Sequence, residues 1–465
     1  MTINSPKAQL TIRSTRIHTP EGWRDGTVVV YGGKIAGVVE PGLAPAAERH
    51  IDAGDKPVIP GLIDTHVHVR DPGFTQKDDW FSASQAAAAG GVTTIIDMPN
   101  VQPVPNNVEV YRSHTANAAG KSVVDFGHNA SATIPENIAG LAEAGATAFK
   151  IFMMTDIGRS YPHMPGTAVN HHGTLFRICE EVAKTGKTLL VHPWDQELYE
   201  LLVTRAQAKW GKDYRSYARA ARQAEGIVFD SGIQTMILMQ RETGVRLHLL
   251  HVMTKGGIQM IKEAQARGQA VTAEANPHSL FIANSWSAIE KWGPYVLGLW
   301  VPEDHAQALW DATVQGGVDV IATDHSPHTR EEKEVGWTDM YATPGGSPLV
   351  QHYLSLMLTA YNEGKISLER IVETCCANPA RLCNVYGTKG AITPGADADL
   401  VVLDLDQEMT IRAEETYYKV GWTTLDGRTV KGVPTHTVLR GNVIAENGVV
   451  TAEAGSGRPI TLPTA

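Results

Sequence analysis

The chain has 465 residues, of which 43% are hydrophobic and 19% charged, and its formal net charge is −10. This length suits a barrel with an accessory module better than one small domain, and the hydrophobic share can fill a sizeable core. The acidic balance, with no run of basic residues, argues against a nucleic-acid partner and against binding to an anionic membrane surface.

The N-terminus and the cysteines predict a soluble, cytoplasmic protein. The opening MTINSPKAQLTIRSTR has no apolar signal segment, and a run of about 18 apolar residues occurs nowhere. The cysteines form no CxxC pair or spaced framework, so we expect neither a thiolate zinc site nor a disulfide scaffold. They are Cys179, Cys375, Cys376 and Cys383.

Both ends of the chain have the texture of short strands. Residues 8–58 alternate β-forming and polar residues and break at Gly, Pro or Asp, and the same pattern returns in ADLVVLDLD and THTVLRGNVIAENGVVTAE. We therefore expect one small β-sandwich domain built from residues 1–58 and 391–465, the latter including a tail. A separate unit would span residues 59–390.

The middle of the chain repeats a short apolar run, a polar loop and an amphipathic helix. Eight candidate strands lie between residues 59 and 328: PGLIDTHVH, GVTTIIDMPN, SVVDFGHNA, ATAFKIFM, TLLVHPWD, RLHLLHV, AVTAEANPH and VDVIATDHSPH. Alternating βα units predict an α/β fold with a parallel sheet, and eight of them predict a closed (β/α)8 TIM barrel. A doubly wound open sheet is the alternative, but it gives no reason for eight units.

The first of these strands ends in His66 and His68. Residues two apart on a strand face the same side, so both imidazoles can reach the barrel mouth, where barrel enzymes build their sites. Imidazole is a common ligand for zinc and other transition metals. An isolated HxH pair is a weak signal, and its position at a first barrel strand strengthens it.

Other strands also end in groups that bind metal or move protons. His192 and His251 follow later strands, although a core histidine bonded to a backbone carbonyl is an equally common arrangement. Lys150 lies between Phe149 and Ile151, where a buried cation is costly; carboxylation by CO2 would make it an anion able to bridge two metals. The alternative is a lysine that extends its ammonium group to solvent.

Asp324, after the eighth strand, completes a set of six side chains, although it could instead cap the following turn. Together with His66, His68, Lys150, His192 and His251 it predicts a site for two divalent metal ions. The metals would lower the pKa of a bridging water, and the resulting hydroxide would attack the carbonyl while Asp324 takes its proton and passes it to the leaving nitrogen. His278 and His328 could orient the substrate or donate to the oxyanion, or be structural.

These residues and the motifs around them resemble the amidohydrolase superfamily, and specifically its cyclic amidohydrolase branch of dihydroorotases, hydantoinases or dihydropyrimidinases, and allantoinases. The resemblance extends from the N-terminal strands through HVHVRDPG, AFKIFM, LHLLHV and ATDHSPHTREEK to NPARLCNVYGTKGAITPGADADLVVLD. It implies His66 and His68 on one metal, His192 and His251 on the other, carboxylated Lys150 between them, and Asp324 as general acid and base. It also implies zinc, with manganese or cobalt as alternatives, and a homodimer or homotetramer.

Within this branch some motifs favour a dihydroorotase, whereas others depart from the dihydroorotase pattern. HVHVRDPG, the DMPN that ends at Asn100 and ATDHSPHTREEK resemble dihydroorotase most closely, and there Arg70 and Asn100 would bind the carboxylate of an anionic substrate. An ion pair between Arg70 and Asp71 or another acid is the alternative. Before the eighth strand the chain reads LGLWVPEDHAQALW, where dihydroorotases and hydantoinases usually carry an N/S-P-P-L-R-like stretch.

Other positions also depart from the pattern of the branch. Trp194 stands where many relatives have an acid. Thr155 replaces the tyrosine with which hydantoinases polarise the carbonyl, and Tyr161, in a long loop from Met153 to Gly173 that we expect to act as a lid, could substitute for it. These departures suggest a ring substrate other than the housekeeping ones.

Trp194, Trp300 and Trp337 near the predicted site loops suggest an aromatic pocket, although ordinary packing would also explain them. The resemblance predicts a small cyclic amide, ureide or imide as the substrate. The same metals would also serve an exocyclic amide. A non-catalytic scaffold of the dihydropyrimidinase-like kind is the remaining alternative, but such proteins lose metal ligands and this chain keeps a suitable residue at every position.

Overall fold

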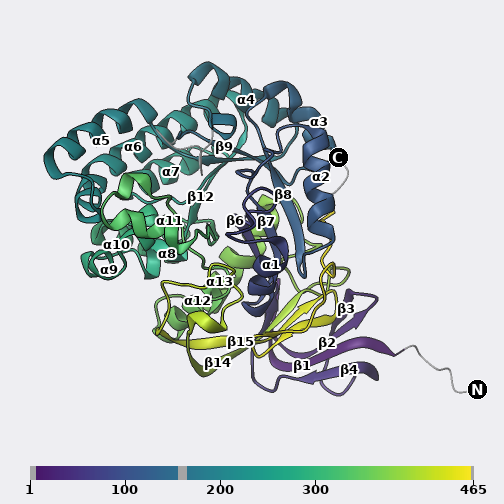
Figure 1. Cartoon of the computed structure of the whole chain (residues 1–465). Coiled ribbons are helices and arrows are strands. Elements are labelled where there is room, and N and C mark those ends of the chain that lie inside the picture. Colours follow the sequence, from purple (N-terminus) through teal and green to yellow (C-terminus); the bar gives the residue numbers. More distant parts are fainter. Residues whose placement is uncertain (1–6, 156–164, 462–465) are drawn as a thin grey trace, which may run out of the picture.

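Eight parallel strands form a barrel at the centre of the molecule (Figure 1). The structure is a computed structural model and describes residues 7–155 and 165–461. The strands pair in chain order, which confirms the predicted α/β barrel. They are β6 (Leu62–Val67), β7 (Val92–Asp97), β8 (Asp125–Ser131), β9 (Ala148–Phe152), β10 (Thr188–His192), β11 (Arg246–Leu249), β12 (Val271–Ala275) and β13 (Val320–Ile321).

The barrel closes between its first and last strands by a few specific contacts. Val67 and His325 form a parallel bridge, and the backbone N–H of His68 donates to the carbonyl of His325 at 2.8 Å. Deeper in the seam, the carboxylate of Asp64 accepts hydrogen bonds from the backbone N–H and the hydroxyl of Thr323, at 3.1 and 2.5 Å. Burial raises the pKa of Asp64 to about 6. These contacts hold together the end of the first strand, which carries His66, and the segment after the last strand, which carries Asp324.

Helices cover the outside of the barrel. Most begin at a side chain that caps the first turn. In α1 the Asp79 carboxylate accepts from the backbone N–H groups of Phe81 and Ser82, and the Ser82 hydroxyl accepts from the backbone N–H of Asp79. The larger helices are α1 (Trp80–Ala89), α2 (Val108–Ala119), α4 (His172–Lys184), α5 (Gln196–Trp210), α6 (Tyr214–Thr243), α7 (Lys255–Ala266), α10 (Glu303–Gln315) and α12 (Tyr353–Asn362). Shorter ones are α3 (Ile138–Glu143), α8 (Pro277–Phe281), α9 (Trp286–Trp292), α11 (Arg330–Glu334), α13 (Leu368–Val372) and α14 (Asn378–Leu382).

Helix α4 shows why these segments are helical and which side they bury. Leu175, Ile178, Cys179 and Val182 are its buried residues, at the spacing of one helical face. Between β10 and β11 the chain forms two longer helices, α5 and α6, which lie side by side at one flank of the barrel (Figure 1). No helix in the described part of the chain combines the length and apolar character needed to cross a membrane.

Both ends of the chain build a second sheet beside the barrel (Figure 1). The hydrogen-bonded order is β17-β16-β15-β14-β5-β1-β2-β3, with β4 paired to β1. These strands surround a core of their own that includes Leu10, Val28, Leu400 and Val438. The strands are β1 (Ala8–Thr19), β2 (Gly22–Tyr31), β3 (Lys34–Val39), β4 (Ala47–Asp52), β5 (Val58–Pro60), β14 (Leu400–Thr410), β15 (Thr429–Leu439), β16 (Asn442–Glu446) and β17 (Val449–Val450).

A buried ionic cluster joins this sheet to the barrel at the start of β8. The carboxylates of Asp125, Asp397 and Asp399 gather closely enough to hold a cation, but the ammonium of Lys389 already lies among them, at 2.8, 3.3 and 2.5 Å respectively. Arg440 pairs with Asp125 as well. The cluster is therefore a structural ionic contact that ties the start of β8 to the segment that leads into β14.

Candidate metal centre and active site

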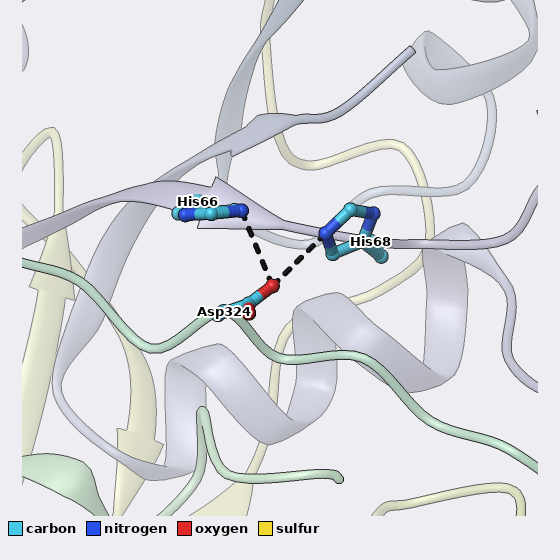
Figure 2. Close-up of side chains that lie close together, drawn as sticks. All are labelled: His66, His68 and Asp324. Carbon is cyan, nitrogen blue, oxygen red and sulfur yellow. Dashed lines mark hydrogen bonds and ion pairs between the residues drawn. The ribbon is translucent and has the colours of Figure 1, made fainter. Parts of the chain in front are cut away.

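Three predicted ligands converge at the mouth of the barrel (Figure 2). His66 and His68 lie at the end of β6, and their Nε2 atoms approach the same oxygen, Oδ1 of Asp324, at 3.2 and 3.0 Å. All three side chains are buried, and their ligand atoms lie within 4.8 Å of one another. Imidazole nitrogens and a carboxylate oxygen form a donor set suited to zinc and similar divalent metals.

The opposite ring nitrogens of the two histidines are held by oxygen acceptors. Nδ1 of His66 lies 2.8 Å from Oε1 of Glu274, and Nδ1 of His68 lies 2.6 Å from Oδ1 of Asn100. An acceptor at Nδ1 places the proton there and leaves Nε2 as the electron-pair donor. Glu274 and Asn100 therefore orient both rings in the form that binds metal.

Glu274, on β12, also connects this pair to a third histidine. Its Oε1 accepts from the backbone N–H of His251 at 3.1 Å and from the side chain of Asn276 at 3.2 Å. The carboxylate is fully buried. Although burial alone would raise its pKa, the neighbouring His66 and His248 hold the pKa of Glu274 well below its usual value, so it is ionised.

His192 and His251 form the other part of the site. His192 ends β10 and His251 follows β11, and their ring centroids are 4.4 Å apart; the rings of His251 and His66 are 5.7 Å apart. Nδ1 of His251 is buried and has no hydrogen-bond partner among the described residues. Burial lowers the pKa of His251 to about 3, so its imidazole is neutral, as a ligand must be.

Lys150 lies on β9 with its side chain fully buried. Its Nζ has no hydrogen-bond partner in the described part of the chain and lies 4.3 Å from the ring centroid of Phe152. Burial lowers the pKa of Lys150 to about 7, although Asp324 and Glu274 act in the opposite direction. A substantial fraction of the amine is therefore neutral at pH 7, and only the neutral amine is nucleophilic.

The three converging side chains differ in their electrostatics. Burial alone would lower the pKa of His66, but the carboxylates of Glu274 and Asp324 raise it above its usual value. Burial lowers the pKa of His68 to about 3, and the charge of Arg70 adds to this effect. For Asp324 burial alone would raise the pKa, but His66 and His68 lower it below its usual value. The site thus presents an ionised carboxylate beside a neutral imidazole at neutral pH.

The backbone is strained where the site is built. The backbone φ angles of Arg70, His251 and Asp324 are 70°, 33° and 49°. They lie in the left-handed region, which residues other than glycine rarely adopt. Each of the three follows a barrel strand. Such strain is maintained by surrounding structure and is concentrated at functional sites.

The four predicted substrate-binding residues are placed differently. Asn100 lines the pocket that contains the histidines, whereas Arg70, His278 and His328 are buried and are not among the lining residues. Arg70 donates to the Ser326 hydroxyl at 2.5 Å and lies 3.2 Å from Nε2 of His328. Asp71 forms its ion pair with Lys121.

Of the three tryptophans expected to form an aromatic pocket, one lines the pocket and two do not. Trp194 lines the pocket, whereas Trp300 is buried outside the lining and Trp337 packs on Tyr214 at a ring distance of 4.9 Å. The backbone N–H of Thr155 donates to Gln196. Tyr161, and with it the central part of the expected lid, lies outside the described residues.

Sequence reasoning missed several residues that the fold brings to the site. Glu274 is one, and the signal was an acidic residue inside the apolar strand VTAEA, where a buried charge needs a partner. Tyr199, Tyr217 and Tyr341 also line the pocket. They lie on α5, on α6 and in the turn Met340–Ala342, not at strand ends, and no pattern in the sequence marks them.

The comparisons with known proteins agree with this geometry. The model of the amidohydrolase family matches residues 58–444. The chain is 34% identical over 460 residues to an L-hydantoinase of Paenarthrobacter aurescens, covering 97% of each chain, and 34% identical to an allantoinase of Streptomyces avermitilis, covering 96% of this chain and 98% of that one. The solved structure of L-hydantoinase (dihydropyrimidinase) from Arthrobacter aurescens superposes with a TM-score of 0.91 at 32% identity, covering 98% of this chain and all of the other.

Proposed function

The chain belongs to the amidohydrolase family, in its cyclic amidohydrolase branch, and from this premise we propose that it opens a cyclic amide, ureide or imide with the help of two divalent metal ions. One metal would be held by His66, His68 and Asp324, and the other by His192 and His251. Lys150, carboxylated by CO2, would bridge the two. Zinc is the expected metal, with manganese or cobalt as alternatives.

The observation that carries this proposal is the convergence of both Nε2 atoms on Oδ1 of Asp324. Two buried atoms nearby, Nδ1 of His251 and Nζ of Lys150, have no hydrogen-bond partner among the described residues. Buried polar atoms are normally paired. A bound cation would pair Nδ1 of His251, and carboxylation would give Nζ of Lys150 a partner. The residues present therefore fit the metals that the family uses.

Metals bound here would activate a water as nucleophile and polarise the scissile carbonyl. The side chains do the rest. Asp324 is ionised, so its carboxylate accepts the proton of the attacking water and then transfers it to the ring nitrogen as the amide bond breaks. Glu274 and Asn100 keep the proton of each imidazole on Nδ1, away from the reaction.

We propose substrate-positioning roles for Arg70, Asn100, His278 and His328. Asn100 would contact the ring from the pocket wall. Arg70 would act through Ser326, whose hydroxyl it contacts and which does line the pocket, and His328 would support Arg70. His278 is buried with both ring nitrogens unpartnered among the described residues.

A panel of ring substrates tests this function. Protein purified without chelators and supplied with zinc, manganese or cobalt should open at least one of hydantoin, dihydrouracil, allantoin, dihydroorotate and a cyclic imide. The ring-opened acid is the product to measure. Activity on exocyclic amides together with inactivity on all the rings would contradict the proposal.

A further inference from the structure

A buried histidine that the proposed reaction does not use lies within the barrel. His248 belongs to β11, the strand that His251 follows, and it pairs with Thr272 of β12 in the parallel ladder. Its side chain is fully buried. The interior of such a barrel is filled mainly by branched apolar side chains, so a polar ring in this place needs polar partners.

The two ring nitrogens of His248 face two side chains of β12. Thr272 and Glu274 are two residues apart on that strand and therefore point to the same side, which is the interior where Glu274 meets His66. Nδ1 of His248 lies 2.7 Å from the Thr272 hydroxyl, which itself donates to the carbonyl of Leu247 at 3.3 Å. The hydroxyl thus accepts from Nδ1, and Nε2 is the nitrogen that faces Glu274.

The two oxygens of Glu274 have unequal surroundings. Oε1 accepts from His66, from the backbone of His251 and from Asn276. Oε2 is buried, and neither this atom nor Nε2 of His248 has a hydrogen-bond partner among the described residues. The two atoms lie 3.7 Å apart, within reach of an ion pair and slightly beyond a hydrogen bond. Each is therefore the polar partner that the other needs.

We propose that His248 is a positioning residue for the metal centre: its Nε2 donates to Oε2 and fixes the plane of the Glu274 carboxylate, which keeps the His66 ring oriented for metal. The inference rests on the proposed function, because it assigns His248 a part in holding that metal. Rotation about the last bond of a glutamate side chain is soft, so Oε1 stays on His66 only while Oε2 is held as well. His248 also helps to keep the pKa of Glu274 well below its usual value.

The test is a double-mutant cycle on zinc affinity, measured by competition with a chelator. His248→Phe keeps a flat ring without either nitrogen, and it should weaken zinc binding by about 10-fold, the lower end of the effect of residues that orient a metal ligand. In a Glu274→Gln background the same substitution should change the affinity by no more than about 2-fold, because the carboxylate through which His248 acts is gone. His248→Leu takes the place of His248→Phe if that variant does not fold.

Two further variants separate a positioning role from a structural one. In His248→Gln the amide nitrogen can take the place of Nε2 as a donor, so this variant should recover most of the zinc affinity that His248→Phe loses. His352→Phe is the matched control: His352 precedes α12, is buried, and does not line the pocket. It should leave zinc affinity unchanged.

Failure of this role is distinguishable from failure of the proposed function. Unchanged zinc affinity in His248→Phe, additive losses in the double variant, or an equal loss in His248→Phe and His248→Gln would overturn the role of His248 while wild-type zinc binding leaves the proposed function intact. A wild-type protein that binds no zinc would contradict the proposed function and the role of His248 with it.

Discussion

Replacing Glu274 with glutamine should weaken metal binding without unfolding the protein. The carboxylate accepts three hydrogen bonds at Oε1, from Nδ1 of His66 at 2.8 Å, from the backbone of His251 at 3.1 Å and from Asn276 at 3.2 Å. Glutamine keeps an oxygen acceptor of nearly the same shape, so the donors stay paired. What is lost is the negative charge that holds the His66 ring and increases its basicity.

The size of the effect follows from the change in hydrogen-bond type. Hydrogen bonds to a charged group contribute about 1.5–3 kcal/mol and neutral ones about 1 kcal/mol, so the bond to His66 should weaken by roughly 0.5–2 kcal/mol. That corresponds to about a 2- to 30-fold loss of metal affinity, at 1.4 kcal/mol per tenfold. The range overlaps the 10- to 100-fold typical of residues that orient a metal ligand.

The assay is a competition between the protein and a chelator of known affinity, with bound zinc measured after equilibration. Asp319→Asn is the control, because Asp319 precedes β13, at the opposite end of that strand from Asp324, and its carboxylate accepts from the backbone of Ala273 on β12. It should lower thermal stability and leave zinc affinity unchanged. A folded Glu274→Gln protein with wild-type zinc affinity would refute the reasoning.

Two further predictions concern the groups that act in the reaction. Asp324→Asn should lower kcat by about 10²- to 10⁴-fold, the usual contribution of a general acid or base, while the protein still binds zinc; near-normal turnover would remove Asp324 from its role. For Lys150, burial lowers the pKa to about 7, so the fraction of neutral amine rises as the pH increases through 7. With the concentration of dissolved CO2 held constant, reactivation of metal-stripped protein by zinc should therefore accelerate between pH 6 and 8. Lys150→Ala should bind fewer metal equivalents and show no bicarbonate dependence, and a reactivation midpoint near pH 10 would contradict the burial argument.

The barrel could be predicted because its signals are local. Each strand is a short apolar run followed by a helix, and parallel strands bring their carboxyl ends to one face, so the strand-end positions of His66, His192 and Asp324 follow from topology alone. The same argument explains why the terminal strands were recognised. The alternation of β-forming and polar residues appears at both ends of the chain, and it can be recognised without knowing which strands pair.

The partners of these residues could not be predicted in the same way. Glu274 reaches His66 across the barrel interior, and only the closed barrel brings β12 and β6 to the same centre. The contacts of Arg70 with Ser326 and His328 likewise join the segments that follow β6 and β13, which are far apart in the sequence. The tyrosines of α5 and α6 depend on how two long helices pack on the barrel, which periodicity does not specify.

Metal reconstitution is the measurement that tests the central claim most directly. Protein stripped with a chelator would be titrated with zinc in bicarbonate buffer, and ring opening of the best substrate followed together with bound metal. The two-metal site predicts that activity is absent without metal and rises until two equivalents are bound per chain. Full ring-opening activity in the metal-free protein, or no ring opening with two equivalents bound, would contradict it.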